Sequence, residues 1–317
     1  MAVLDRRART RGRTADSITI QTRHQGSVGR WLVAPAFIYA VLVTQIPFIL
    51  TLYYSTFRKN LLRPERTAFV GLENYRRTIF EDPVFRDALV NTLIFTIATV
   101  FISLVLGLCF AELVNHRFPG RGIVRTMLIT PFLVMPVASA LGWKNMMLDP
   151  VFGIIDWLLV ELSPGSLDWH PVWLAELPRE SIIMILVWRW APFMMLILLA
   201  GMQSIDEEVR EAARVDGATP IQEFASITMP HLYRFMQLGA LLGAVYVVQE
   251  VDAIFMTTQG GPGTLTTNLP YYVYETAIRG SQLGRGAAIG VVVVALTIVA
   301  MTGLFRVLDR MLRGFYD

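Results

Sequence analysis

Long stretches without any charged side chain restrict the fold of this sequence more than any other feature. They run from Trp31 to Phe57, Ala88 to Ala111, Thr126 to Trp143 and Gly286 to Phe305. A helix of about 20 residues crosses a hydrocarbon core about 30 Å thick. The chain is 54% hydrophobic and only 17% charged, whereas soluble domains contain about 25% charged residues. The sequence therefore predicts a helical membrane protein.

Two further stretches are apolar except for isolated ionisable residues. Ser181 to Met202 contains Arg189, and Phe235 to Met256 contains Glu250 and Asp252. Together the six stretches predict an all-α polytopic bundle over residues 31–317, preceded by an Arg-rich tail, residues 1–30. The spans are expected at about 31–57, 88–111, 124–147, 181–202, 233–256 and 286–308.

Basic residues predict the orientation, because loops rich in Lys and Arg stay on the cytoplasmic side of the membrane. The tail contains seven arginines between Arg6 and Arg30. Six spans place both termini on that side. The first outer loop, Arg58 to Asp87, is an exception, because it also contains several arginines. Its mixed charge predicts a small folded segment. The segment Asp149 to Glu180 is acidic and rich in Trp and Pro, which predicts an ordered surface structure with an amphipathic or interfacial helix.

Charge and cysteine content exclude several other classes of protein. The formal net charge is only +3, and the charges are separated by apolar runs, so no nucleic-acid partner is expected. A single cysteine excludes an internal disulfide and a Cys-based metal site. No metal ligand set or catalytic residue is predicted.

The polar stretch 204–230, between the fourth and fifth spans, has the pattern of a helical hairpin. Ser204 with Glu207, and Thr219 with Gln222, have the spacing of capping boxes. Gly217 lies between them and can adopt the left-handed conformation that ends a helix. Such an amphipathic hairpin is suited to binding another protein, although a connector lying on the lipid surface remains an equal alternative from the pattern alone.

At this stretch the sequence resembles a known family. Glu211-Ala212-Ala213, then Gly217, then Ile227-Thr228-Met229-Pro230 resemble the EAA loop of permease subunits in bacterial binding-protein-dependent ABC importers. The run from Arg210 to Ala218 is similar to the carbohydrate branch, which includes maltose and glycerol-phosphate importers. The outer-loop residues Gly260, Gly261 and Pro262 extend the similarity, which covers roughly Trp31 to the C-terminus.

The resemblance implies a type I ABC importer permease fold in the bacterial cytoplasmic (inner) membrane. It implies a second homologous permease, a dimer of ATPase subunits and an extracytoplasmic substrate-binding protein as partners, with membrane lipid around the spans. ATP and Mg would bind to the ATPase partners, and no cofactor is expected in this chain. Its only lysines, Lys59 and Lys144, follow Arg58 and Trp143, so it has no Gly-Lys-Ser/Thr of a Walker A loop. The residues implied in coupling to the ATPase are Glu211, Ala212, Ala213, Asp216, Gly217, Ile227 and Pro230.

The ionisable residues inside the spans indicate where substrate could pass, because such groups line cavities or pair with each other. Arg189 and Glu250 lie at similar depths, so we weigh a structural ion pair and a polar substrate site equally. The pathway candidates are Arg189, Trp188, Trp190, Tyr246, Gln249, Glu250, Asp252, Asn91 and Lys144, with Tyr274 as a weaker one. The substrate would be a sugar, glycoside, polyol or sugar or glycerol ester, either neutral or anionic.

A stand-alone secondary transporter or an intramembrane enzyme is the alternative function. A secondary transporter often contains internal repeats, and this sequence has no convincing one. No histidine begins an HExxH motif and no serine lies in a GxSxG motif. The predicted function is therefore the permease subunit of an ATP-driven importer.

Overall fold

The computed structural model describes residues 33–162 and 171–316. The chain divides into two compact units, Met1–Tyr53 and Tyr54–Asp317. The described part of the first unit belongs to the helix Val33–Ser55. The predicted Arg-rich tail, residues 1–30, and part of the second outer segment lie outside the described residues.

Four described helices are long and apolar enough to span a membrane: Val33–Ser55, α3 (Pro83–Asn115), α8 (Pro178–Gln203) and the Leu283–Arg306 part of α14 (Leu283–Tyr316). A fifth candidate is a bent pair in the region predicted as the third span, 124–147. In it, α4 (Arg121–Leu133) is followed after a break by α5 (Pro136–Gly142) and the π-helical turn η3 (Trp143–Met147), at an angle of 100°. Pro136 explains the break, because it disfavours helical geometry at the residue before it.

The prediction of one continuous helix for the fifth span, 233–256, is wrong. The helix α11 (Met229–Val248) starts earlier and ends at Val248, and α12 (Asp252–Met256) follows after a break. No glycine or proline lies between them. The buried side chain of Glu250 accounts for the break, because its Oε1 accepts a hydrogen bond from Ala253 N, 3.1 Å away, in the first turn of α12.

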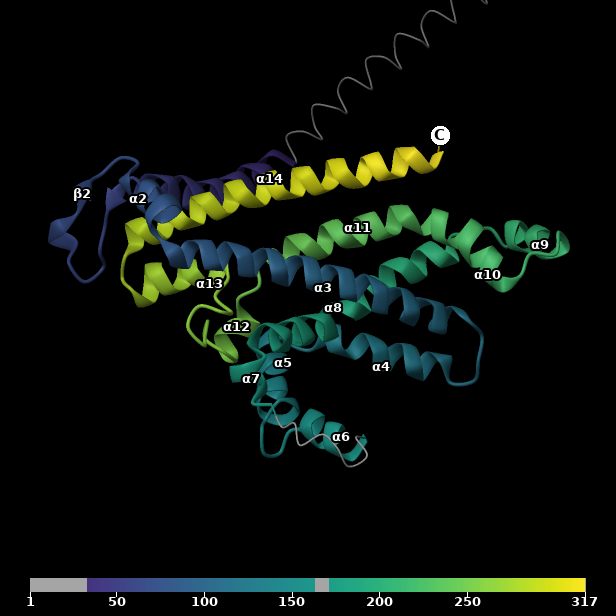
Figure 1. The fold of residues 1–317 in the computed structure, drawn as a ribbon. Coiled ribbons are helices and arrows are strands. Elements are labelled where there is room, and N and C mark those ends of the chain that lie inside the picture. The colour runs from purple at the N-terminus through teal and green to yellow at the C-terminus, as the bar shows by residue number, and fades with distance from the viewer. Residues whose placement is uncertain (1–32, 163–170, 317) are drawn as a thin grey trace, which may run out of the picture. The chain divides into compact units, whose positions relative to one another are not determined.

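The centre of the second unit is α8, against which α3, α4 and α11 pack (Figure 1). Met194, Met195 and Leu198 of α8 are completely buried. Gly107 of α3 allows the closest approach, because a Cβ atom there would lie 2.6 Å from Met194 Cβ and 2.8 Å from Met195 N. Helix α14 packs against α11 on the other side of this layer.

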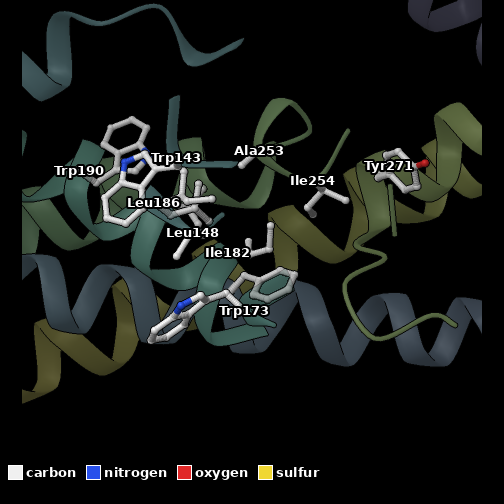
Figure 2. Close-up of a cluster of buried hydrophobic side chains, with 12 residues drawn as sticks. Trp143, Leu148, Trp173, Ile182, Leu186, Trp190, Ala253, Ile254 and Tyr271 are labelled. Carbon is white, nitrogen blue, oxygen red and sulfur yellow. The ribbon is translucent and has the colours of Figure 1, made fainter. Parts of the chain in front are cut away.

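A second part of the core joins the N-terminal half of α8 to the broken helices. Trp143, Ile182, Leu186 and Trp190 gather there with Ile254 of α12 (Figure 2). These side chains come from η3, α8 and α12, so the cluster stabilises the positions of the short helices that follow both breaks.

The first outer loop is a small folded segment, as the sequence predicts. Strands β1 (Phe57–Arg58) and β2 (Ala68–Phe69) pair antiparallel around the 3-10 turn η1 (Pro64–Arg66). The helix α2 (Glu73–Arg76) and the π-helical turn η2 (Arg77–Glu81) follow. Asn74 holds the segment together, since its buried amide donates to Ser55 O at 2.8 Å and Phe57 O at 2.9 Å.

The second outer segment contains α6 (Ile154–Leu162) and α7 (Trp173–Glu176), consistent with the expected short surface helix. Further along, α13 (Leu269–Tyr274) and the π-helical turn η5 (Glu275–Arg279) precede α14.

A buried polar cluster ties α3, α13 and α14 together. Asp82 caps α3 through Val84 N and also accepts hydrogen bonds from Tyr272 and, at 2.6 Å, from Arg285. Burial and the bond to Asp82 raise the pKa of Tyr272 to about 12. The Tyr272 hydroxyl therefore remains a hydrogen-bond donor at neutral pH.

We expect Gly107→Ala to destabilise the protein, because the added methyl group would overlap α8 and overpacking costs about 1–3 kcal/mol. Thermal unfolding in detergent should show a lower Tm. The matched control is Gly122→Ala in α4, where a Cβ atom meets nothing within 4 Å. An equal Tm for the two variants would contradict the close approach of α3 and α8.

Candidate functional site

The predicted helical hairpin is present at one end of the second unit, far from the first outer loop (Figure 1). It consists of α9 (Glu207–Val215), α10 (Pro220–Glu223) and the π-helical turn η4 (Phe224–Thr228), which leads directly into α11. Gly217 has a φ of +82°, the left-handed conformation that the sequence predicts for the turn.

One of the two predicted capping boxes is confirmed and the other is wrong. Thr219 and Gln222 bond reciprocally at the start of α10. At the start of α9, however, the N-cap is Asp206, and its side chain makes no capping bond. Ser204 instead donates to Gly201 O and bonds to His231 Nε2, both at 2.8 Å, so its hydroxyl ties the end of α8 to α11.

Ion pairs hold the two helices of the hairpin together. Glu223 of α10 pairs with Arg214 at 3.3 Å and with Arg210 at 3.9 Å, both from α9. Arg210 also donates to Met202 O at the end of α8, at 3.0 Å. The sequence reasoning missed this cluster, because the residues come together only once the Gly217 turn has formed. The cluster joins the hairpin to the end of α8.

The residues implied in coupling differ in their exposure. Four are exposed, namely Glu211, Ala212, Asp216 and Gly217, whereas Ala213, Ile227 and Pro230 are half-buried. Two apolar residues that the sequence reasoning did not select are the most accessible of the hairpin's large hydrophobic side chains. Val215 is 87% exposed and Ile221 is 80% exposed. The hairpin therefore presents both apolar and charged side chains to its surroundings.

A polar cavity of about 950 Å³ lies between the hairpin and the connection from α3 to α4. Glu112, His116 and Arg121 line it on one side, and Arg210 and Glu223 line it on the other. The cavity therefore places the α3–α4 connection next to the hairpin's ion pairs.

Arg189 of α8 and Glu250 lie together in the structure. They form a buried ion pair with two contacts between guanidinium and carboxylate. Arg189 Nη1 lies 3.4 Å from Glu250 Oε1, and Nη2 bonds to Oε2. The two residues are 7% and 6% exposed. Because Oε1 also accepts from Ala253 N, both carboxylate oxygens of Glu250 are occupied.

Aromatic side chains surround one side of this ion pair. Trp190 stacks on Tyr246 of α11, with ring centroids 5.4 Å apart, and the Arg189 guanidinium lies 5.8 Å from the Trp190 ring centroid. Trp188 packs edge-to-face with Trp143, at 5.8 Å. Trp190 is 7% exposed and Tyr246 is 55% exposed, so Tyr246 is the more accessible member of the stack.

The other pathway candidates fall into accessible and structural groups. Gln249 and Asp252 are exposed at the break between α11 and α12. Lys144 donates to Met256 O at 3.5 Å and Thr257 O at 3.2 Å, at the end of α12. Tyr274 packs edge-to-face with Phe255. Lys144 and Tyr274 therefore hold α12 and α13 in position.

Asn91 also has a structural role, because it anchors the outer loop that contains Gly260, Gly261 and Pro262. Asn91 lies in α3, and its side-chain amide donates to Thr264 O and Thr267 O, both at 2.8 Å. Within the loop, Thr266 N donates to Gly260 O at 3.1 Å, and the peptide bond from Gly261 to Pro262 is cis.

Comparisons with known proteins identify the family of the chain. The family model described as "Binding-protein-dependent transport system inner membrane component" matches residues 103–314. The chain is 31% identical to the trehalose/maltose transport system permease protein MalF of Thermococcus litoralis, over 89% of this chain and 95% of that protein. It is 32% identical to the sulfoquinovosyl glycerol transport system permease protein SmoG of Agrobacterium fabrum, over 87% and 89% of the two chains.

The fold is also that of a solved transporter chain. A bacterial ABC transporter involved in the import of the acidic polysaccharide alginate superposes with a TM-score of 0.74 and 21% identity, over 89% of this chain and 96% of that chain. The resemblance found in the sequence is thus confirmed, and an intramembrane enzyme is set aside. The chain belongs to the family of binding-protein-dependent transport system inner membrane components, as a multi-pass ABC importer permease without ATPase function of its own.

Proposed function

We propose that this permease forms half of the translocation pathway for a carbohydrate, and that it has six transmembrane helices with both termini in the cytoplasm. The relatives named for trehalose/maltose and sulfoquinovosyl glycerol transport support the substrate class. Counting the bent pair as one span, α11 makes the sixth. Its 20 residues suffice for a hydrocarbon core about 30 Å thick. The basic residues of the sequence support the orientation.

The hairpin formed by α9 and α10 is the surface that binds an ATPase subunit. The observation that carries this assignment is the exposure of Val215 and Ile221 on a hairpin whose two helices are joined by the ion pairs of Glu223. An exposed apolar surface on a rigid element is a usual feature of a protein-binding site. The turn η4 continues into α11, and Arg210 donates a hydrogen bond to the end of α8. A movement of the bound ATPase subunit would therefore displace both helices together with the hairpin.

The complete importer would contain this chain, a second homologous permease, an ATPase dimer and a periplasmic binding protein. Affinity purification of the tagged chain from its native membrane in mild detergent, followed by mass spectrometry, tests this composition. Recovery of a permease and an ATPase is the expected result. Recovery of the chain alone, with transport that persists without ATP, would contradict it.

We expect Gly217→Glu to leave the protein inserted in the membrane but to reduce both co-purification of the ATPase and transport, at least tenfold. The residue would introduce a charge at the centre of the binding surface, and a left-handed conformation strains it by about 1–2 kcal/mol. No atom lies within 4 Å of a Cβ placed at Gly217, so the fold itself has room for the side chain.

Gly71→Glu is the matched control for Gly217→Glu. Gly71 also has a positive φ, +56°, and open space around a Cβ, but it lies in the first outer loop. It should keep the ATPase bound. Equal ATPase recovery from both variants would contradict the proposal that the hairpin binds the ATPase subunit.

The ion pair of Arg189 and Glu250 serves the structure of the break between α11 and α12 rather than substrate binding. We expect Arg189→Ala to lower the Tm markedly, because an uncompensated buried charge costs about 3–5 kcal/mol. The double variant Arg189→Met/Glu250→Gln should recover most of the loss, since the Gln amide oxygen still accepts from Ala253 N. A normal Tm for Arg189→Ala with a raised half-saturating substrate concentration would instead make Arg189 a substrate ligand.

The substrate surface consists of Tyr246, Gln249 and Asp252, exposed at one side of α11 and at the break that follows it. A tyrosine ring stacks on a sugar face, and an exposed carboxylate accepts hydrogen bonds from hydroxyl groups. Arg189 and Lys144, the two cations among the pathway candidates, are both occupied, because Arg189 pairs with Glu250 and Lys144 donates to backbone carbonyls. A neutral sugar or polyol therefore fits this surface better than a sugar phosphate.

We expect Asp252→Asn to raise the half-saturating concentration of a transported neutral sugar several-fold while the complex assembles normally. The measurement is uptake into proteoliposomes that contain the co-purified partners, with radiolabelled disaccharides, polyols and sugar phosphates. Glu65→Gln in the first outer loop, an exposed residue, is the control for loss of a carboxylate. Unchanged uptake by Asp252→Asn, or a preference for sugar phosphates, would exclude this surface.

A further inference from the structure

The first outer loop and the start of α14 form a cavity lined mainly by cationic side chains. It has a volume of about 300 Å³, and its nine lining residues comprise three amides and six cations: Arg58, Lys59, Arg63, Arg66, Arg77 and Arg285. No carboxylate lines it. The size is that of a small-molecule site.

Backbone contacts build this cavity from segments far apart in the sequence. Leu61 N donates to Ser281 O at 2.9 Å, and Gly284 N donates to Lys59 O at 3.1 Å. These bonds hold the loop against the first turn of α14 and bring Arg285 to the arginines of the loop. The cations therefore gather because the fold places them there and not only because they are close in sequence.

Most of this positive charge is not neutralised within the part of the chain that the structure describes. Arg77 pairs with Glu73 at 2.8 Å, and Arg285 pairs with Asp82 at 2.6 Å. Arg58, Arg63 and Arg66 form no ion pair with described residues. Lys59 lies over the Tyr54 ring, 4.1 Å from its centroid, which leaves its charge in place.

Like charges held together in this way repel one another, so the arrangement favours a bound anion. Guanidinium groups match phosphate oxygens with paired hydrogen bonds. Exposed apolar residues lie in the same loop: Leu62 is 79% exposed and Phe69 is 70% exposed. Basic side chains beside exposed apolar ones are typical of segments that meet a lipid headgroup.

We propose that this cavity, which we call the basic pocket, binds a phosphate-type oxyanion. The anion is the headgroup of an anionic phospholipid or a free phosphate compound. The proposal is independent of the coupling hairpin, which lies at the other end of the unit (Figure 1). It also explains why the loop that we place on the outer side keeps so many arginines, contrary to the usual charge bias.

The test compares the full chain with Arg63→Gln/Arg66→Gln in nanodiscs of phosphatidylcholine, with or without phosphatidylglycerol. Lipids retained after detergent extraction are counted by native mass spectrometry, and Tm is measured with and without inorganic phosphate. Both arginines are exposed and unpaired with described residues, so the variant should fold. The control Arg76→Gln/Arg86→Gln removes the same charge from α2 and the first turn of α3, outside the basic pocket.

We expect the wild type and the control to retain phosphatidylglycerol roughly fivefold or more over phosphatidylcholine, and the Arg63/Arg66 variant to lose this preference. That result identifies a lipid headgroup. A phosphate-dependent rise in Tm in phosphatidylcholine nanodiscs, absent from the Arg63/Arg66 variant, identifies a free anion instead. Equal lipid retention and equal phosphate response in all three proteins would overturn the proposal. If transport by the Arg63/Arg66 variant fell while lipid retention and phosphate response stayed equal, the partner of the arginines would be an acidic protein surface instead.

Discussion

The buried carboxylate of Glu250 connects more elements of this permease than any other single interaction we describe. Its side chain pairs with Arg189 of α8 and caps α12 through Ala253 N, while its backbone carbonyl accepts from Asn268 at 2.5 Å. Asn268 in turn caps α13 through Tyr271 N. Moving two charged groups out of water costs free energy unless the remaining hydrogen bonds of both groups are satisfied. Here Arg189 and Glu250 make two contacts with each other, and Glu250 also accepts from Ala253 N. The pair is thus a joint that fixes where α11 stops.

The break that this joint maintains has consequences for transport. A helix that stops inside the bundle exposes polar groups without leaving them in contact with lipid, which is tolerated where they face protein or a water-filled pathway. Gln249 and Asp252 are exposed on either side of Glu250. The same break buries one carboxylate and leaves another exposed, which is why we propose a structural role for Glu250 and a substrate-binding role for Asp252.

The sequence predicts apolar segments and local turns well, because both depend on nearby residues. Gly217 and the Thr219–Gln222 capping box are where the pattern places them. Prediction from the sequence fails where a residue distant in the chain forms the hydrogen bond that a local motif would otherwise form. Ser204 has a capping-box spacing, yet its hydroxyl bonds to His231, 27 residues away. The break after Val248 has no glycine or proline signal, because tertiary contacts of Glu250 produce it.

The same distinction explains which site residues could be found from the sequence. The similar depths of Arg189 and Glu250 in their spans suggested their contact, but which of their oxygens and nitrogens are occupied depends on the folded break. The pairing of Glu223 with Arg210 and Arg214 requires the hairpin to close. It is this closure that turns a polar connector into a rigid body. If ion pairs and the bond from Arg210 to Met202 O hold the hairpin to α8 while η4 continues into α11, the hairpin cannot move independently of those two helices. Since the pair of Arg189 and Glu250 joins α8 to the end of α11, we propose that a displacement of the hairpin is transmitted to the break where Gln249 and Asp252 are exposed.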